Sequence, residues 1–409
     1  MLSGSPSNKY LAKNSREEDD QNIKYQRYEV ELGHSIHPNE ILSKLRQYHP
    51  ITLKFLDGQD TCSEFVEGKT LGQGKSGTVF EIDEKEHKGL PVVLKEFKIK
   101  ESTTIKDVLG KKLFLMSSSL TEVIMSSIFH SFYDGGWTYS ISFPYFEGFF
   151  ACKPYGYSIV EKLENTLARY IDGPRFNSKS FKVIVFQSLY AIKFMVKRQI
   201  VHNDMHAKNI MTRSTNGISY RGAALDDFRY FSYTDGNNVY THENTGIIAK
   251  IVDFDFSCKY SDPMVCPTKV YNKQQDDWNL QFRFSTSYDF LTFIAYLVYY
   301  TIIRKPGDSR LSNKEIDETR KIVRKLAEYV VKVAEHKIGE IDYLGHFSDK
   351  MGRPDSKRNA ISKLMDMVST PQYRPYEKYS HLDLDGILNI DLFDEYKTQN
   401  GNSLMVGMM

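Results

Sequence analysis

The sequence predicts an α+β fold in which short strands come first along the chain and long helices follow. Residues 64–99 alternate apolar and polar side chains with a period of two, as half-buried strands do. The stretches 181–196 and 290–303 are strongly apolar and long enough for buried helices. A third stretch, 312–338, places apolar side chains at helical spacing between charged ones. We therefore expect a strand-rich part followed by a larger, mainly helical part.

Composition and charge narrow the class of protein. Hydrophobic residues make up 41% and charged residues 26% of the chain, which is typical of a soluble globular protein. The formal net charge of +2 argues against nucleic-acid binding by bulk electrostatics, so we expect no direct nucleic-acid partner. The four cysteines fit no zinc or disulfide spacing and indicate reduced thiols in an intracellular protein.

No targeting or membrane segment is expected. The N-terminus lacks the apolar core of a signal peptide, and Leu2 stands where N-myristoylation requires a glycine. The longest apolar run, 290–303, is about 14 residues long and suits a buried helix better than a membrane span. These features predict a soluble intracellular protein.

Local patterns predict the remaining segments. Residues 1–25 are polar and charge-rich and are expected to be disordered. Residues 38–45 have the composition of a helix start, and this helix would either pack on the strand-rich part or dock a partner. Residues 117–129 and 360–368 are predicted helices, and residues 398–409 are expected to form a loose tail.

Two further elements have recognisable ends. Ser312 and Glu315 form a capping box at the start of the long amphipathic helix, and Gly339 ends it. Residues 228–240 are typical of a strand, an Asp-Gly turn and a second strand. We expect this pair of strands to form an elaborated hairpin beside the active site.

A polar stretch at 200–211 has the side chains that phosphoryl transfer needs. One carboxylate must accept the proton of an attacking hydroxyl, and a nearby amide oxygen must help to hold Mg²⁺. Asp204 suits the first role and Asn209 the second, while His202 would hydrogen-bond the loop as a scaffold residue. Alone the pattern is weak, because this spacing arises by chance in many polar loops.

A glycine-rich loop lies upstream. Gly72, Gly74 and Gly77 are followed by Val79 in the pattern G-x-G-x-x-G-x-V, and Lys95 lies on a later strand. The glycines let the backbone pass close over phosphates, and the lysine can pair with them.

Two other phosphate-binding motifs are excluded. A dinucleotide fingerprint needs a helix directly after its glycines, but residues 78–82 alternate like a strand. A Walker loop needs a glycine five positions before the glycine of its Gly-Lys-Ser/Thr, and neither Gly68 nor Gly74 has one.

Downstream, the stretch 249–257 contains an apolar strand that ends in Asp253 and Phe254. Asp253 would hold the catalytic Mg²⁺. With three such motifs in this order, the chain resembles the protein-kinase superfamily over roughly residues 66–385.

The resemblance implies a two-lobed fold, with a small, mostly antiparallel β lobe that carries one main helix and a larger, mainly helical lobe. It implies ATP and Mg²⁺ (or Mn²⁺) as cofactors and the serine or threonine hydroxyls of proteins as acceptors. The implied domains are an N-terminal extension at 1–63, the small lobe and hinge at 64–163, the large lobe at 164–395 with an enlarged hairpin at 212–250, and a tail at 396–409.

The resemblance also assigns roles outside the motifs. Glu122 would pair with Lys95, and we prefer it to Glu101 because its helical neighbours are apolar, although a surface glutamate is the alternative. An insertion around 101–115 would explain the long separation from Lys95. Backbone groups of Glu161 and Leu163 would bind the adenine, so that side-chain identity matters little there.

Asp289 has two interpretations. In kinases a buried aspartate at this place hydrogen-bonds the catalytic-loop backbone, whereas any acid at a helix N-terminus is favoured by the helix dipole. Both stay open from the sequence.

Three departures bear on mechanism and origin. Asn203 replaces the usual arginine, and Asp255 replaces the glycine of Asp-Phe-Gly. His206 replaces a lysine that helps to hold the γ-phosphate, so we expect His206 to contact that phosphate or the acceptor. The Asp-Phe-Asp motif and the enlarged hairpin resemble kinases of large nucleocytoplasmic DNA viruses such as poxviruses, which act in the host cytoplasm or the virion.

Two other functions remain possible. The catalytic-loop pattern is also similar to that of choline and aminoglycoside kinases, which phosphorylate small-molecule alcohols. A non-catalytic pseudokinase would require the loss of an essential group, yet Lys95, Asp204, Asn209 and Asp253 are all present.

Overall fold

The structure is a computed structural model. It describes residues 9–10, 28–31, 54–55, 69–74, 77–82, 91–98, 103–107, 112–116, 118–134, 140–152, 155–220, 223–260, 266–267, 285–303, 312–338, 364, 382–397 and 403–407. The helices predicted at 38–45 and 360–368 lie outside these residues, apart from residue 364.

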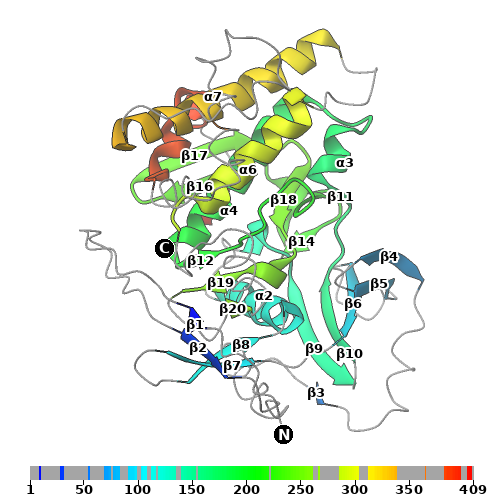
Figure 1. The fold of residues 1–409 in the computed structure, drawn as a ribbon. Helices are drawn as coiled ribbons and strands as arrows, with labels where there is room; N and C mark the ends of the chain where they lie inside the picture. Colours follow the sequence, from blue (N-terminus) through cyan, green and yellow to red (C-terminus); the bar gives the residue numbers. More distant parts are fainter. Residues whose placement is uncertain are drawn as a thin grey trace, which may run out of the picture.

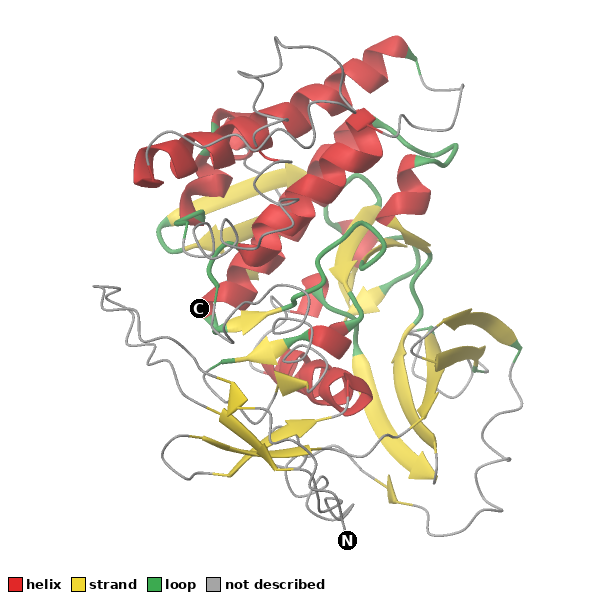
Figure 2. Ribbon diagram, in the orientation of Figure 1, coloured by secondary structure: helices red, strands yellow, loops and turns green. Residues whose placement is uncertain are grey.

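A six-stranded sheet dominates the strand-rich part (Figures 1 and 2). All neighbouring strands in it are antiparallel except β3 and β9, which run parallel. In sheet order the strands are β3 (Lys54–Phe55), β9 (Phe146–Cys152), β10 (Tyr155–Glu161), β6 (Val92–Lys98), β5 (Gly77–Glu81) and β4 (Thr70–Gly74).

Helix α2 (Ser118–Asp134) packs beside this sheet and confirms the predicted helix, with one more turn at its C-terminal end. Its buried face includes Ile124, Ile128 and Phe129, the apolar setting that singled out Glu122. The insertion expected before it is a hairpin of β7 (Thr103–Asp107) and β8 (Lys112–Met116).

This hairpin belongs to a second, five-stranded sheet, which also contains two strands from earlier in the chain and one from much later. Strand β2 (Tyr28–Glu31) pairs with β7, and β1 (Lys9–Tyr10) pairs with β2. Lys9 and Tyr10 thus lie in a strand within the segment 1–25 that we expected to be disordered. On the other side, β20 (Cys266–Pro267) pairs in parallel with β8.

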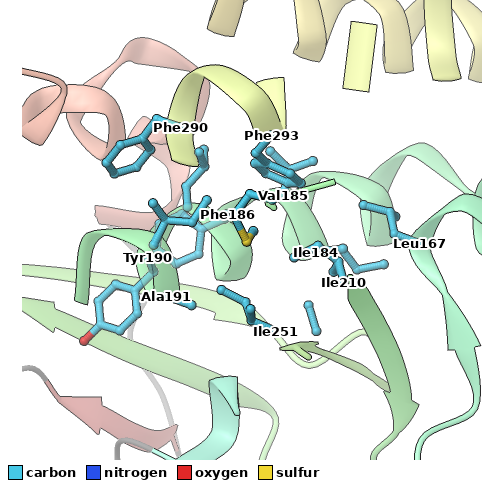
Figure 3. Close-up of a cluster of buried hydrophobic side chains, with 14 of the residues drawn as sticks. Leu167, Ile184, Val185, Phe186, Tyr190, Ala191, Ile210, Ile251, Phe290 and Phe293 are labelled. Carbon is cyan, nitrogen blue, oxygen red and sulfur yellow. The ribbon is translucent and has the colours of Figure 1, made fainter. Parts of the chain in front are cut away.

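The helical part is built around α4 (Ser178–Lys197), which is buried along most of its length. Figure 3 shows its Ile184, Val185, Phe186 and Tyr190 packed among side chains from other elements, such as Phe290 and Phe293. Around it lie α3 (Leu167–Ile171), α6 (Tyr288–Val298) with the π-helical η6 (Tyr299–Ile303), α7 (Asn313–Ile338), η8 (Asp385–Asn389) and η9 (Asp391–Lys397).

Only half of the predicted capping box forms at the start of α7. The Ser312 hydroxyl accepts the N–H of Glu315 at 3.2 Å, as expected. The Glu315 carboxylate, however, accepts the N–H of Ser178 at 2.6 Å, and Glu318 accepts the Ser178 hydroxyl at 2.8 Å. These acids therefore join α7 to the N-terminus of α4, where carboxylates are favoured by the unpaired N–H groups.

The predicted hairpin at 228–240 is confirmed as β16 (Tyr230–Asp235) and β17 (Asn238–Glu243), with Gly236 in the turn at φ 59°. Its expected place beside the active site is wrong. Tyr233 and Tyr240 pack against Phe186 of α4, and β17 packs on η9. The hairpin thus lies against α4 and η9, and none of its residues belongs to the wall of the cavity described below.

Strands β13 (Ile210–Ser214) and β18 (Ile247–Ile251) flank this insertion and pair with each other. Between β13 and β16 lie β14 (Ser219–Tyr220), β15 (Ala223–Ala224) and η4 (Leu225–Asp227). The expected loose tail is also wrong in part, because β21 (Ser403–Gly407) pairs in parallel with β16.

Two expectations about the whole chain can be compared with the described residues. None of the described helices is both long and apolar enough to cross a membrane. Cys258 is disulfide-bonded, so the prediction of a reduced thiol is wrong for this residue.

Candidate active site

A cavity of about 780 Å³ is lined by both parts of the molecule. The sheet contributes Val79 and Val93, and the helical part contributes Met211 and Val252. Of the residues predicted from the sequence, the cavity wall includes Gly72, Val79, Lys95, Glu122, Glu161, Leu163, Asn209 and Asp253. Gly74, Gly77, Asp204 and His206 do not belong to this wall.

The first and third glycines of the glycine-rich motif meet different surroundings. A Cβ atom on Gly77, at φ 149°, would lie 1.8 Å from the backbone oxygen of Glu96 on β6, so only glycine fits there. A Cβ on Gly72 would meet nothing within 4 Å. Gly77 is therefore needed for the close approach of β5 to β6, a reason that differs from the phosphate contact expected from the motif.

Lys95 on β6 and Glu122 on α2 form an ion pair. The Lys95 ammonium lies 2.5 and 2.7 Å from the two Glu122 carboxylate oxygens and 4.0 Å from Oδ1 of Asp253. Burial alone would lower the pKa of Lys95, but Glu122, Asp253 and Asp255 together raise it above its usual value. The lysine is held charged, with three carboxylates around one cation.

The Asp289 side chain supports the polar loop at residues 202–209, the predicted catalytic loop. Its carboxylate accepts the N–H of His202 at 2.7 Å and that of Asn203 at 3.0 Å. Asn203 has a left-handed backbone, with φ 63°, and these two bonds fix that turn directly before Asp204. Burial raises the pKa of Asp289 to about 6. The interpretation of Asp289 as the buried support of this loop is the one that fits.

Asn203 also joins the loop to the segment after Asp253. Its side-chain amide donates to the backbone oxygen of Phe256 at 3.0 Å. In the same region β12 (Ile200–Val201) pairs with β19 (Cys258–Lys259). The neutral amide that replaces the arginine thus contacts the backbone of this segment directly.

Asp204, His206 and Asn209 lie together on the loop. The amide nitrogen of Asn209 donates to the backbone oxygen of Asp204 at 3.0 Å, which leaves its amide oxygen as a possible metal ligand. His206 Nδ1 accepts the N–H of Lys208 at 3.2 Å, and Nε2 lies 3.6 Å from Oδ2 of Asp204. The ring of Tyr296 packs against His206 at 5.3 Å between centroids.

Asp253 fits a metal ion. It has a left-handed backbone with φ 66°, an uncommon conformation for a residue other than glycine. Its Oδ1 is buried with no hydrogen-bond partner among the described residues. Carboxylate and amide oxygens are the ligands that Mg²⁺ prefers, and Asp253 and Asn209 both line the cavity.

The last residue of β10, Glu161, belongs to a buried ion cluster that the sequence did not predict. The predicted hinge begins there. Glu161 Oε2 lies 2.9 Å from Nζ of Lys250, and Oε1 lies 3.4 Å from the Arg213 guanidinium. Glu161 Oε2 also accepts the N–H of Tyr145 at 2.9 Å. The expectation that side-chain identity matters little at Glu161 is therefore wrong, because this carboxylate is fully buried and paired.

A lysine within the apolar run 249–252 was the one available signal for this cluster. A charge in a buried strand needs a partner. The partner is distant in sequence, so the pattern alone could not name it.

The comparisons agree with this geometry. The family model for the protein kinase domain matches residues 65–274, while no curated protein matched the chain. The match covers β4, β5, β6, β9 and β10 of the sheet, α2, the loop with Asp204 and the strand before Asp253, and the chain belongs to the protein kinase domain family.

Proposed function

We propose that the protein transfers the γ-phosphoryl group of ATP to serine or threonine hydroxyls of protein substrates. The observation that carries this proposal is the Lys95–Glu122 ion pair with Asp253 4.0 Å from the same ammonium. A charged lysine at that place can hold phosphates, and it is already oriented without a ligand.

Each predicted residue has a role in this proposal. Asp204 accepts the proton of the attacking hydroxyl, and Lys95 pairs with the nucleotide phosphates. His206 contacts the γ-phosphate or the acceptor beside Asp204, since its Nε2 faces that carboxylate. Asn209 and Asp253 hold Mg²⁺ (or Mn²⁺), which when bound neutralises the phosphate charge.

The adenine would lie against the hinge, bordered by Val79, Val93 and Val160. The N–H of Glu161 already donates to the backbone oxygen of Tyr145 at 2.8 Å and is not available to the base. The base would instead contact the Glu161 carbonyl and the Leu163 backbone. Gly72 and Gly74 would cover the phosphates from β4.

The domain assignment follows from this function. Residues 64–163 would form the small lobe and hinge, 164–395 the large lobe, 1–63 an extension and 396–409 a tail. From the Asp-Phe-Asp motif and the large insertion between residues 212 and 250 we also propose a relationship to kinases of large DNA viruses.

A small-molecule alcohol kinase is the second candidate, favoured by its similar catalytic-loop pattern. A pseudokinase is the third. The test is transfer from radiolabelled ATP to generic proteins, choline and aminoglycosides in parallel. We expect label in serine and threonine of protein. Label only in the small molecules would support the second candidate, and ATP binding without any transfer would support the third.

A further inference from the structure

Two cations at the mouth of the cavity have no role in the function proposed so far. Arg169 and Lys208 line the cavity, yet both side chains are largely exposed to solvent. They come from different elements, α3 and the catalytic loop. Such a pair of cations at an open rim can receive an anionic ligand.

The backbone fixes the two residues side by side. Ala168 N–H donates to the Ala207 carbonyl at 3.0 Å, and Arg169 and Lys208 are the next residues on either side of this bond. Thr166 caps α3 through the N–H of Arg169 at 3.2 Å. Figure 1 shows α3 next to β11 (Asn165–Thr166), where the hinge enters the helical part.

Within the described part of the chain, neither side chain has an ion-pair or hydrogen-bond partner. The other cations of the cavity are occupied, because Lys95 pairs with Glu122, Arg213 with Glu161 and Lys162 with Glu81. Glu164 is the nearby acid on the same wall, and its carboxylate accepts the N–H of Ser214 at 2.8 Å. Arg169 and Lys208 are thus left for a ligand.

The position of Lys208 suggests which ligand this is. Its N–H is bonded to His206 Nδ1, and His206 faces Asp204, so Lys208 belongs to the same short loop as the proposed base. An acceptor hydroxyl must reach Asp204 from solvent, and the residues flanking that hydroxyl then pass the exposed rim. The phosphates, in contrast, have Lys95 and the metal ligands deeper in the cavity.

We propose that Arg169 and Lys208 select acceptor segments that carry aspartate or glutamate beside the phosphorylated residue. This inference rests on the proposed protein-kinase function and adds its substrate class. Both cations can pair with carboxylates, Arg169 in a bidentate manner.

The first test measures kcat/KM for peptides that share one serine and differ only in flanking residues, which are acidic, neutral or basic. Two partly exposed ion pairs should favour the acidic over the neutral peptide by about tenfold at low salt. The preference should shrink as ionic strength rises. In R169E/K208E it should invert toward the basic peptide.

The matched control is R324E/K332E, which makes the same charge change at two exposed residues of α7 outside the cavity wall. It should keep the acidic preference. Equal rates on all peptides in the wild type, or an acidic preference that survives R169E/K208E, would overturn the proposal. An altered affinity for a fluorescent ATP analogue with unchanged peptide preference would assign the cations to the nucleotide instead.

A binding measurement separates this proposal from the kinase function. Fluorescence anisotropy with labelled peptides, in which alanine replaces the serine, needs no catalysis. Tighter binding of the acidic peptide to wild type than to R169E/K208E supports the anion site even if no phosphate is transferred. Equal binding of acidic and basic peptides to the wild type contradicts it, whatever the activity.

Discussion

Two lysine–glutamate pairs lie at the cavity, and they differ in what surrounds them. Nζ of Lys95 lies 2.5 Å from Oε1 of Glu122, and the two side chains are 17% and 15% exposed. Nζ of Lys250 lies 2.9 Å from Oε2 of Glu161, and both side chains are 0% exposed. Both pairs thus contribute at least one residue to the cavity wall, but the first pair is partly open to solvent and the second is sealed from it.

The first pair is surrounded by an excess of negative charge, and the second by an excess of positive charge. Lys95 has Glu122, Asp253 and Asp255 around it, an excess of carboxylates that a divalent cation would offset. Glu161 has two cations, Lys250 and Arg213, and its remaining oxygen lone pairs accept the Tyr145 N–H. The first cluster is incomplete without a ligand, whereas the second is satisfied within the chain. We infer that the first serves function and the second holds the hinge.

The largest effect is expected on stability at the buried pair. Lys250→Met removes the nearer of the two cations and leaves the buried Glu161 with Arg213 alone, which should cost about 3–5 kcal/mol in the free energy of unfolding. Urea denaturation measures this loss. The double variant Glu161→Gln/Lys250→Met should recover part of it, because glutamine still accepts from Tyr145 and carries no charge. A loss below about 1 kcal/mol in the single variant would mean that water reaches the site.

At the cavity the effect should fall on activity instead. Asp253→Ala removes a proposed metal ligand whose Oδ1 has no hydrogen-bond partner among the described residues. We expect kcat to fall by roughly a hundredfold or more, with an unfolding midpoint close to that of the wild type. Wild-type turnover in the purified, folded variant would remove Asp253 from the metal site.

Asp289 lies outside the cavity wall, and its protonation should make the free energy of unfolding depend on pH. Its pKa of about 6 in the folded protein is above the value of 3.8 expected when unfolded, so the folded state binds the proton more tightly. The stability gained from this proton is present below pH 4 and is lost as pH rises through 6, by at most about 3 kcal/mol. Asp289→Asn should lack this slope. Parallel curves of unfolding free energy between pH 4 and 7 for the two proteins would disprove it.

The smallest of these effects concerns the orientation of Lys95. Glu122→Ala leaves the Lys95 charge in place but removes the group that positions it, so we expect roughly a tenfold loss in kcat/KM for ATP. Lys95→Met should lose more, because the charge itself is gone. If Glu122→Ala is silent while Lys95→Met is inactive, the ion pair has no part in catalysis.

The contrast between these two ion pairs also shows which parts of the site could be predicted from the sequence. Lys95 and Glu122 were predictable because each lies in a local pattern, one on an alternating strand and the other in an apolar helix. Lys250 and Arg213 were missed as partners of Glu161 because their contact depends on where three distant segments meet. The sequence separation exceeds the range of any periodicity.

The pairing of β21 with β16 was missed for a related reason. A parallel pair between segments so far apart leaves no turn signal in the sequence, and the same residues look like a loose tail. The hairpin at 228–240, in contrast, has its turn residues in place and was predicted correctly, although its expected place beside the active site was wrong.

The central claim is that the cavity cluster performs phosphoryl transfer with Asp204 as the base. The most direct measurement is single-turnover transfer from radiolabelled ATP to a protein substrate by wild type and Asp204→Asn, with nucleotide affinity determined in parallel. We predict equal nucleotide affinity and a transfer rate roughly a hundredfold or more lower in Asp204→Asn. An unchanged transfer rate in Asp204→Asn, or no transfer by the folded wild type with ATP bound, would contradict the claim.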